Sequence, residues 1–341
     1  MLLRYAAVLA TLAAAAIPAR AQTPAPVQTP ALTKVTLGTD WLAEAEHGGF
    51  YQAVALGLYK KHGLDVTIKM GGPQTNGNAA IATGQVEFQL SSGGFAALSM
   101  VEQHIPVLAV AAFFQKDPQV MISHPGTGTD TLAQMKGHPI LISAGARTGL
   151  WLFLRAKFGF TDDQIRPYNF SMAPFLVDKS VVMEGFLSSE PFQIEQQAGF
   201  KPVVNLLADN GFDNYSDVIL AQKALVDAKP EVVRAFVDAS AEGWYSYMYG
   251  DPAPGNALIR AANKDMTQAI IDNAIAVMRA HGVVDSGDSL TMGIGAMTAA
   301  RWRHFADSMI AAGIYPAGLD SAQAFTTAFV DRKVGMELRP K

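Results

Sequence analysis

The sequence of 341 residues contains no cysteine. Cysteine nucleophiles and thiolate metal sites are therefore excluded. An oxidising compartment permits disulfides but does not require them, so the absence is compatible with export. The lipid-bearing cysteine that tethers many exported bacterial proteins is absent too, and we therefore expect a freely soluble protein.

Charge is also scarce, since charged residues make up only 16% of the chain and the formal net charge is −4. With an isoelectric point of about 6.0, nothing in the composition suggests a nucleic-acid partner or an anionic membrane surface. Half of the residues are hydrophobic, which is typical of a folded protein with a large core. The length allows two domains of roughly 100–200 residues each.

Short catalytic motifs are missing as well. The sequence has no Gly-x-Ser-x-Gly elbow, no His-Glu-x-x-His and no Gly-x-Gly-x-x-Gly after a strand. Its seven histidines are scattered, and no two of them are four residues apart. We therefore predict that the protein is not an enzyme and has no catalytic residue, no metal site and no cofactor.

The start of the chain has the pattern of a targeting segment. Arg4 supplies a positive charge, residues 5–17 are rich in alanine and leucine, and Ala19-Arg20-Ala21 fits a cleavage site. We predict a signal peptide over residues 1–21 and a periplasmic location; a retained N-terminal anchor is the alternative. The apolar run is too short for a spanning helix. The Pro/Thr/Ala-rich residues 22–33 are predicted to be a disordered spacer.

From residue 34 onward, strand-like stretches alternate with stretches of helical spacing. Residues 34–38 and 64–70 fit strands on either side of a helix that begins at Gly49. Repetition of this unit predicts an α/β fold with parallel sheets in two lobes. After residue 222 the pattern is helical, with segments over 230–249, 257–262, 266–281, 292–312 and 322–330. We expect a first lobe of residues 34–123 with 223–341, and a second lobe of residues 124–222.

Three stretches carry a resemblance to a known family: GTDWLAEAEHGGFYQAVALGLYKKHGLDV, GGPQTNGNAAIATGQVEFQLSSGG and SSEPFQIEQQAGF. Together with the export signal, they resemble the solute-binding proteins of the sulfonate, nitrate and thiamine-pyrimidine family, which serve ABC importers. The pattern is most similar to the subgroup that binds formylated aminopyrimidine precursors of thiamine. The resemblance covers nearly all of the predicted mature chain. It implies a two-lobed periplasmic binding protein fold of type II, with two crossing strands as a hinge, that closes on its ligand.

The resemblance also implies the partners: a small heteroaromatic solute and an ABC permease in the inner membrane, with the binding protein itself a monomer. An alkanesulfonate, taurine or nitrate ligand is the alternative within the family. A ligand-sensing domain that partners a membrane receptor is another. A fungal pyrimidine synthase shares the implied fold but relies on a cysteine-rich motif, and a chain without cysteine argues against that enzyme.

Four candidate ligand-binding residues stand near the end of the first predicted strand, where ligands sit in open α/β sheets. Trp41 offers an aromatic face for stacking, with a core position as the alternative. Asp40 could accept a hydrogen bond from an amine or act as a turn residue. His47, at a predicted helix start, could line the ligand or cap the helix. Tyr51 is a candidate because its hydroxyl needs a partner.

Two later loops are predicted to cradle ligand oxygens with backbone N–H groups. Ser91, Ser92 and Gly93 follow a strand and open a helix, an arrangement that simple N-capping also explains. Gly145, Arg147 and Thr148 repeat the pattern in the second lobe, where Arg147 suits a carboxylate, formyl or sulfonate oxygen. Arg147 could equally form a surface ion pair.

Glu190 is the last candidate, and it opens the phrase Glu-Pro-Phe. The resemblance implies that a polar residue of this phrase reaches the ligand from the second lobe. A carboxylate suits an aminopyrimidine because it accepts hydrogen bonds from an amino group. A helix N-terminal glutamate before proline would have the same sequence without any ligand.

Overall fold

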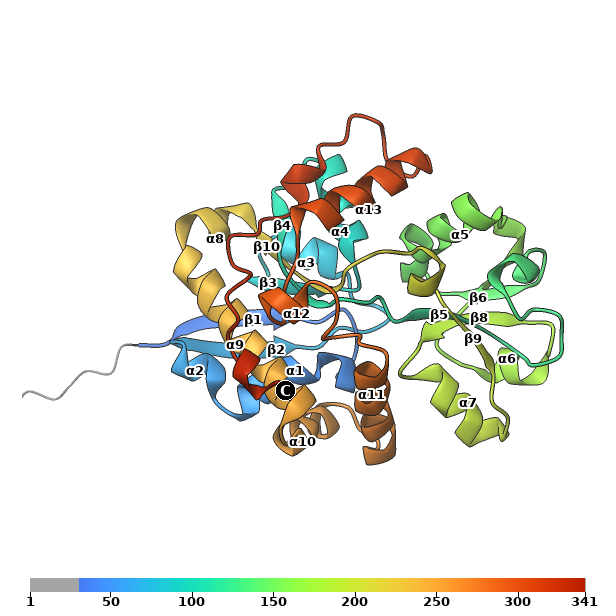
Figure 1. Ribbon diagram of the computed structural model, residues 1–341, viewed down its shortest axis with the longest axis horizontal. Coiled ribbons are helices and arrows are strands. Elements are labelled where there is room, and N and C mark those ends of the chain that lie inside the picture. Colours follow the sequence, from blue (N-terminus) through green and yellow to red (C-terminus); the bar gives the residue numbers. More distant parts are fainter. Residues whose placement is uncertain (1–30, 341) are drawn as a thin grey trace, which may run out of the picture. The chain divides into compact units, whose positions relative to one another are not determined.

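Two five-stranded sheets organise residues 31–340, the part of the chain that the computed structural model describes (Figure 1). The first sheet has the order β2-β1-β3-β10-β4, formed by β1 (Thr33–Gly38), β2 (Leu64–Lys69), β3 (Phe88–Ser91), β4 (Val107–Phe114) and β10 (Ser216–Gln222). The second has the order β7-β6-β8-β5-β9, formed by β5 (Gln119–Ser123), β6 (Ile140–Ile142), β7 (Ile165–Pro167), β8 (Val182–Phe186) and β9 (Val203–Leu206).

Both sheets are mixed, whereas the alternation of strands and helices predicted parallel ones. In the first sheet, β10 runs antiparallel to β3 and β4, and in the second, β5 runs antiparallel to β8 and β9. In each sheet, the antiparallel strand is the first one that the chain forms after it has crossed from the other sheet. A strand that arrives by crossing over has no helix to reverse the chain before it pairs.

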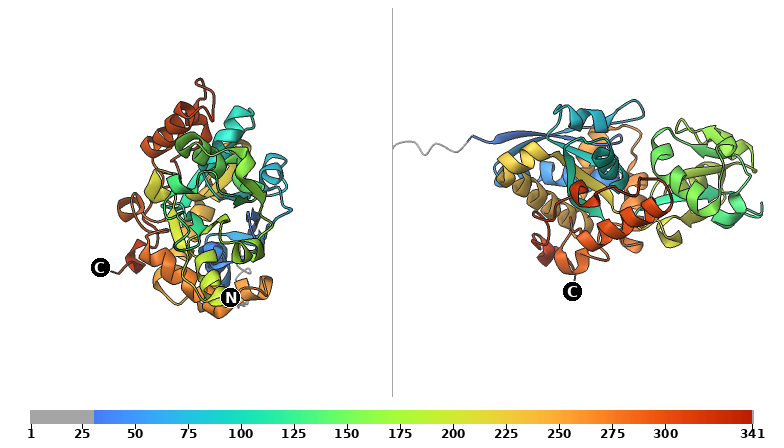
Figure 2. Two further views of the ribbon diagram at one scale, coloured as in Figure 1. Left: turned by 90° about the vertical axis from the view of Figure 1, so that its right-hand side faces the viewer. Right: turned by 90° about the horizontal axis from the view of Figure 1, so that it is seen from above.

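The crossings also differ from the prediction in position. Since β5 belongs to the second sheet and β10 to the first, the chain crosses at residues 115–118 and 207–215 rather than at 123 and 222. Neither crossing segment is itself a strand, although the resemblance implied crossing strands. The two lobes of the implied fold are nevertheless present, with the green segments of the second sheet to one side of the first (Figures 1 and 2).

Most helices belong to the lobe of the first sheet (Figure 1). They are α1 (Gly48–Ala55), α2 (Leu58–Lys61), α3 (Gly77–Ala82), α4 (Gly94–Glu102), α8 (Lys223–Ala228), α9 (Pro230–Tyr249), α10 (Ala253–Ala262), α11 (Gln268–Ala280), α12 (Ser289–Met292) and α13 (Ala299–Ala311). The second sheet carries α5 (Leu150–Phe158), α6 (Ala173–Val177) and α7 (Glu190–Ala198). Both α5 and α7 end at a glycine with positive φ, Gly159 and Gly199, where a left-handed residue closes the last turn.

The long helix α9 contributes many side chains to the core of the first lobe. Trp244, Tyr245 and Tyr247 of this helix are fully buried and belong to the core of the first lobe. Gly48 and Gly49 at the start of α1 lie directly against Tyr247 and Trp244, where a Cβ atom would overlap the rings. These glycines therefore serve the packing of α1 on α9.

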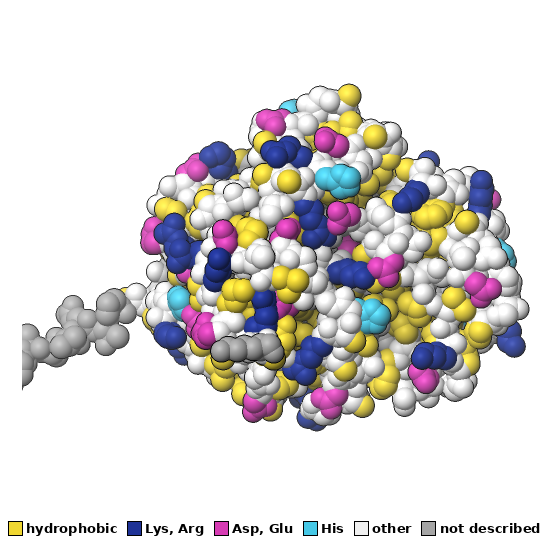
Figure 3. Space-filling view, in the orientation of Figure 1, with side chains coloured by type: hydrophobic (Ala, Val, Ile, Leu, Met, Phe, Trp, Pro, Cys, Tyr) yellow, Lys and Arg dark blue, Asp and Glu magenta, His cyan; other side chains and the backbone are white. Residues whose placement is uncertain are grey.

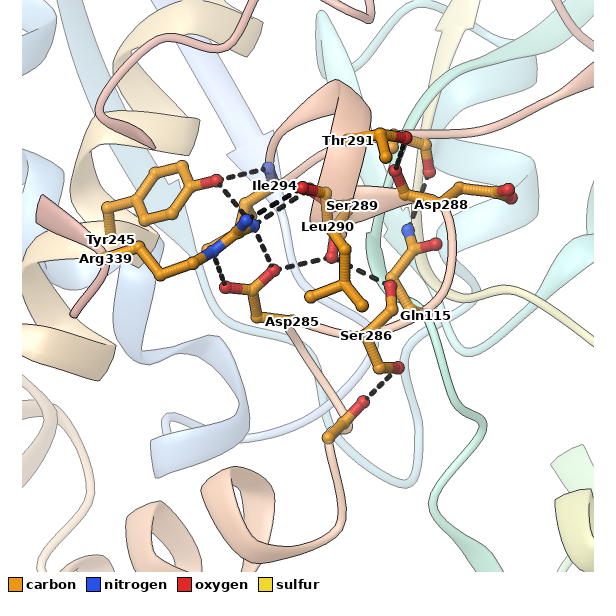
Figure 4. A network of polar contacts seen from close by, with 12 residues as sticks. Gln115, Tyr245, Asp285, Ser286, Asp288, Ser289, Leu290, Thr291, Ile294 and Arg339 are labelled. Atoms are coloured by element: carbon orange, nitrogen blue, oxygen red, sulfur yellow. Dashed lines mark hydrogen bonds and ion pairs between the residues drawn. The ribbon is translucent and has the colours of Figure 1, made fainter. Parts of the chain in front are cut away.

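A polar network fixes the end of the chain to the first lobe (Figure 4). The guanidinium of Arg339 donates from Nε and Nη2 to the two carboxylate oxygens of Asp285, at 2.7 and 2.6 Å. Tyr249 and Ser289 donate to the same carboxylate, which is 4% exposed. Bidentate, charge-assisted pairs of this kind are among the strong hydrogen bonds of proteins.

The remaining predictions have mixed outcomes. The helix over 230–249 has the predicted bounds, but 292–312 is helical chiefly over α13, and 322–330 contains only part of a short 3-10 turn, Ser321–Ala324. The signal peptide over 1–21 and residues 22–30 of the predicted spacer lie outside the described residues, while Thr33 already belongs to β1. No helix within residues 31–340 has the length and apolarity that a membrane crossing needs.

Candidate functional site

The candidate site is built by segments that follow the carboxyl ends of parallel strands in both sheets. After β1 come residues 39–47, after β3 residues 92–93, after β6 residues 143–149 and after β8 residues 187–189. The antiparallel strands β10 and β5 begin at the same edges, because Val218 pairs with Ser91 and Gln119 with Phe186. In open α/β sheets this edge is where ligands bind.

Trp41 meets an aromatic residue of the second lobe. Its ring lies 4.1 Å from that of Phe170, centroid to centroid, with 51° between the planes. Phe170 is 41% exposed and has a left-handed backbone (φ +60°), which a bulky residue adopts only when its surroundings hold it there. The Trp41 carbonyl accepts from Thr39 Oγ1 and Gly71 N, so the loop that presents Trp41 is fixed. The two rings form an aromatic surface across the lobes.

His47 and Asp40, both predicted ligand residues, contact each other. His47 Nε2 lies 3.2 Å from Asp40 Oδ1 and 3.9 Å from Glu44 Oε1. The imidazole is 2% exposed, and its Nδ1 has no hydrogen-bond partner within residues 31–340. His47 also precedes α1 directly, as predicted, but makes no side-chain cap.

Tyr51 is 6% exposed, on the buried side of α1. Burial raises the pKa of its hydroxyl to about 12, and the nearby charge of Glu44 adds to the shift. The Tyr51 hydroxyl therefore stays protonated as a donor close to the residues that follow β1.

The first predicted cradle, at Ser91, Ser92 and Gly93, is largely occupied by the protein's own groups. The N–H of Gly94, which has no partner within its own helix α4, donates to Asn214 Oδ1 at 2.9 Å. Ser91 Oγ donates to the Gly93 carbonyl, and the Ser92 carbonyl accepts from Ser216. Of the three predicted residues, Gly93 directs its N–H to Ser91 Oγ at 3.5 Å, and Asn214 of the second crossing caps the helix that follows.

The second predicted cradle, around Gly145 and Thr148, is also occupied in part. Ser143 N donates to the Glu184 carboxylate at 3.0 Å, and Ala146 N donates to Ser143 Oγ at 3.3 Å. Thr148 Oγ1 turns back to the Gly145 carbonyl at 3.1 Å.

Arg147 is exposed and lines a cavity of about 400 Å³ with Trp151, Leu152, Arg155, Asp162, Ile165 and Pro167. All of these residues belong to the second lobe, and no other predicted ligand residue lines the cavity. Trp41 is not among the residues that line this cavity.

Glu190 begins α7 and is partly buried. Its Oε2 accepts from the backbone N of Phe186 at 2.7 Å. Burial raises the pKa of Glu190 to about 7, although the Phe186 N–H favours the charged form. Burial also raises the pKa of Glu184 to about 7, although the hydrogen bond from Ser143 lowers it. Their neighbour Tyr168 is 5% exposed.

Glu46, Ser188 and Asp217 were not predicted as residues of the site. Glu46 is 4% exposed and accepts a hydrogen bond from Ser188, so this contact joins the two lobes. Asp217 is 3% exposed in β10, with a left-handed backbone (φ +47°) and an unpartnered Oδ2 among the described residues. Its signal in the sequence is a single carboxylate directly before the apolar run VILA in the phrase SDVILAQ.

The described residues offer no metal site, because no three His, Asp or Glu side chains within 31–340 are grouped to hold an ion. On the face drawn in Figure 3, basic and acidic side chains are interspersed without a large area of one sign.

Comparisons with known proteins agree with this architecture. The sequence profile of the NMT1/THI5 like family matches residues 44–254. The riboflavin-binding protein RibY of Chloroflexus aurantiacus is 25% identical over 314 residues, which cover 88% of this chain and 86% of RibY.

Solved structures extend the likeness. The periplasmic aliphatic sulphonate binding protein SsuA of Escherichia coli superimposes with a TM-score of 0.65 at 13% identity, covering 86% of this chain and 92% of SsuA. The desulfurization enzyme DszB gives a TM-score of 0.56 at 12% identity, covering 90% of this chain and all of DszB. The chain therefore belongs to the NMT1/THI5 like family and has the two-lobed fold of the periplasmic binding proteins.

Proposed function

We propose that the protein is the periplasmic substrate-binding component of an ABC importer, and that it binds a small nitrogen heterocycle such as an aminopyrimidine precursor of thiamine. The observation that carries this proposal is the aromatic pair of Trp41 and Phe170 beside carboxylates from both lobes. A flat ring stacks on such a surface, and ring amino groups donate to carboxylates. Family membership supports the same class of function.

The binding step follows from the positions of these groups. The ring of the solute stacks on Trp41, while Glu190 accepts a hydrogen bond from an exocyclic amino group. Closure of the lobes through the contact between Glu46 and Ser188 removes water from the ligand and strengthens both interactions. A dissociation constant in the micromolar range, roughly −8 kcal/mol, suits capture and later release to a permease.

A sulfonate, taurine or nitrate ligand is the weaker alternative. An anion needs free N–H donors or a cation, yet the Gly94 N–H and the Ser143 N–H donate to Asn214 and Glu184. Arg147 lines the cavity in the second lobe instead. Riboflavin, the ligand in the name of RibY, is a flat heterocycle and belongs among the compounds to test.

An enzymatic function has less support. DszB shares the fold, so the fold alone does not decide between binding and catalysis. The chain has no cysteine for a pyrimidine synthase of the fungal kind. We propose binding without turnover, by a monomer that delivers its solute to the permease.

Thermal unfolding with a panel of solutes tests the proposal: 4-amino-5-hydroxymethyl-2-methylpyrimidine, its formylaminomethyl analogue, riboflavin, taurine, an alkanesulfonate and nitrate. A ligand that binds the folded state alone raises the midpoint, by the equivalent of about 2.7 kcal/mol at a concentration one hundred times its dissociation constant. We expect a pyrimidine to raise the midpoint and the anions to have no effect. A response to anions alone would contradict the proposal.

Two substitutions locate the site. Trp41→Ala removes stacking worth roughly 0.5–1.5 kcal/mol beyond the buried area, and Glu190→Gln removes the carboxylate while keeping the shape of the side chain. Glu195→Gln, at an exposed position of the same helix, is the matched control. Unchanged pyrimidine binding in both Trp41→Ala and Glu190→Gln would mean that the site lies elsewhere.

A further inference from the structure

Six carboxyl groups gather at the candidate site without a lysine or arginine partner. They are Asp40, Glu44 and Glu46 after β1, Asp217 in β10, Glu184 in β8 and Glu190 in α7. Within residues 31–340, their only ion-pair partner is the imidazole of His47, which lies near Asp40 and Glu44. The first lobe supplies four of the groups and the second lobe two.

These groups are close enough to act on one another. Burial raises the pKa of Glu44 well above its usual value, and the charges of Glu46, Asp40, Glu190 and Asp217 raise it further. Burial likewise raises the pKa of Asp217, with added effects from Asp40 and Glu46. The carboxyl groups of both lobes therefore repel one another when they are ionised, and this repulsion is relieved when members keep their protons or when a positive charge joins the cluster.

Two members of the cluster also have an oxygen that accepts no hydrogen bond from the described residues. Asp217 Oδ2 and Glu184 Oε2 lack a partner, although the residues are only 3% and 7% exposed. The other oxygen of Glu184 already accepts from Ser143. A buried carboxylate oxygen without a donor is unfavourable, so each of these two atoms can gain from a hydrogen bond that no described residue supplies.

Asp217 adds backbone strain to this picture. Its φ of +47° is unusual for a residue other than glycine or asparagine. Strained residues persist where surrounding structure holds them, and they concentrate at ligand sites. Here the strained residue lies next to Ser216, whose side chain is bonded to the Ser92 carbonyl, so β10 holds Asp217 against the loop that follows β3.

We propose that the site selects solutes that carry a positive charge, such as a heterocycle with a protonated amino substituent, over neutral analogues of the same shape. This inference rests on the proposed binding function and names the charge of its substrate. The ammonium group compensates the charge of the cluster and donates to one of its unpartnered carboxylate oxygens, that of Asp217 or that of Glu184, while the face of Trp41 attracts a cation within about 6 Å.

Two pairs of probes of nearly equal shape test the selection by titration calorimetry at pH 7.5. The first pair is 4-amino-5-aminomethyl-2-methylpyrimidine, a cation, and its neutral 5-hydroxymethyl analogue. The second pair is the cation 1-methylnicotinamide and neutral nicotinamide, which do not depend on the pyrimidine proposal. We expect the cation of at least one pair to bind at least ten times more tightly than its neutral partner.

Two variants connect the preference to the cluster. Asp217→Asn and Glu184→Gln are each expected to reduce the preference for the cation at least fivefold, with less effect on the neutral probe. Asp307→Asn, at an exposed position of α13, is the control. Two independent variants are used because either one alone could fail to fold.

The outcomes are distinguishable. Equal or tighter binding of the neutral pyrimidine, together with no preference for 1-methylnicotinamide over nicotinamide, overturns the charge inference and leaves the proposed function intact. If neither pyrimidine binds but 1-methylnicotinamide binds more tightly than nicotinamide, the charge inference stands and the pyrimidine proposal fails. If neither cation binds at millimolar concentration, or if both variants retain the full preference, the charge inference is wrong.

Discussion

Ser188 is the residue whose removal should most directly loosen the contact between the lobes. It lies in the turn before α7 and is 1% exposed. Its hydroxyl donates to the buried carboxylate of Glu46, and its carbonyl accepts from Asn273 Nδ2 at 3.1 Å. One residue of the second lobe is thus bonded to two elements of the first, the 3-10 turn Ala45–His47 and helix α11.

The substitution Ser188→Ala removes the bond to Glu46 and leaves the bond to Asn273, which involves only the backbone of residue 188. A hydrogen bond to a charged group contributes about 1.5–3 kcal/mol. Since each 1.4 kcal/mol is a factor of ten, the equilibrium between closed and open lobes should shift toward open by roughly tenfold to a hundredfold. Ligand affinity should fall by a similar factor if binding requires closure.

The lack of cysteine makes the measurement simple, because two introduced cysteines are the only labelling sites. Lys60→Cys and Lys179→Cys place dyes at exposed positions of the first and second lobes. Single-molecule energy transfer without ligand should show a larger low-transfer population in Ser188→Ala. Ser189→Ala is the control, since that hydroxyl only accepts from Gln193 within α7. Identical distributions for all three proteins would refute the reasoning.

Three further predictions concern stability. Burial raises the pKa of Asp117 and Glu184 to about 7, so the folded protein holds protons that the unfolded chain releases near pH 4. Without ligand, the free energy of unfolding should therefore fall as the pH rises from 5 to 7. In urea titrations, Asp117→Asn should make this dependence on pH less steep. Arg339→Ala should reduce the free energy of unfolding by about 1.5–3 kcal/mol, because Asp285 loses its charged partner, whereas exposed Arg303→Ala should have little effect. Arg301 donates to the carbonyls of Gln115 and Asn214, one in each crossing, and so links the two crossings. Arg301→Ala should therefore increase hydrogen exchange at 115–118 and at 207–215 together. An increase in only one of these segments would contradict a link through Arg301.

Periodicity predicted the elements whose local pattern is strong. The helix over 230–249 has Pro230 at its first position and an apolar face toward the sheet, and its bounds agree with the structure. It was harder to predict which sheet each strand joins, because β5 and β10 are short, largely apolar strands whose sequences do not indicate the strands with which they pair. The pairing of β10 between β3 and β4 depends on contacts more than 100 residues apart in the sequence.

The candidate site was predictable where a residue type has few other uses, as with Trp41 at a strand end. It was harder to predict which N–H groups of the loops are open to a ligand. Those of Gly94 and Ser143 are paired with Asn214 and Glu184, which lie far away in the sequence. The role predicted for Arg147 stays a prediction, because the position of its loop relative to the first lobe depends on how the two lobes meet.

The central claim, a heterocycle held between Trp41 and the carboxylates, is tested most directly by calorimetric titration of the protein with 4-amino-5-aminomethyl-2-methylpyrimidine. The account predicts one site per chain with a dissociation constant in the micromolar range or below, weakened at least tenfold by Trp41→Ala and by Glu190→Gln. Absence of binding, or binding that neither substitution weakens, would contradict it.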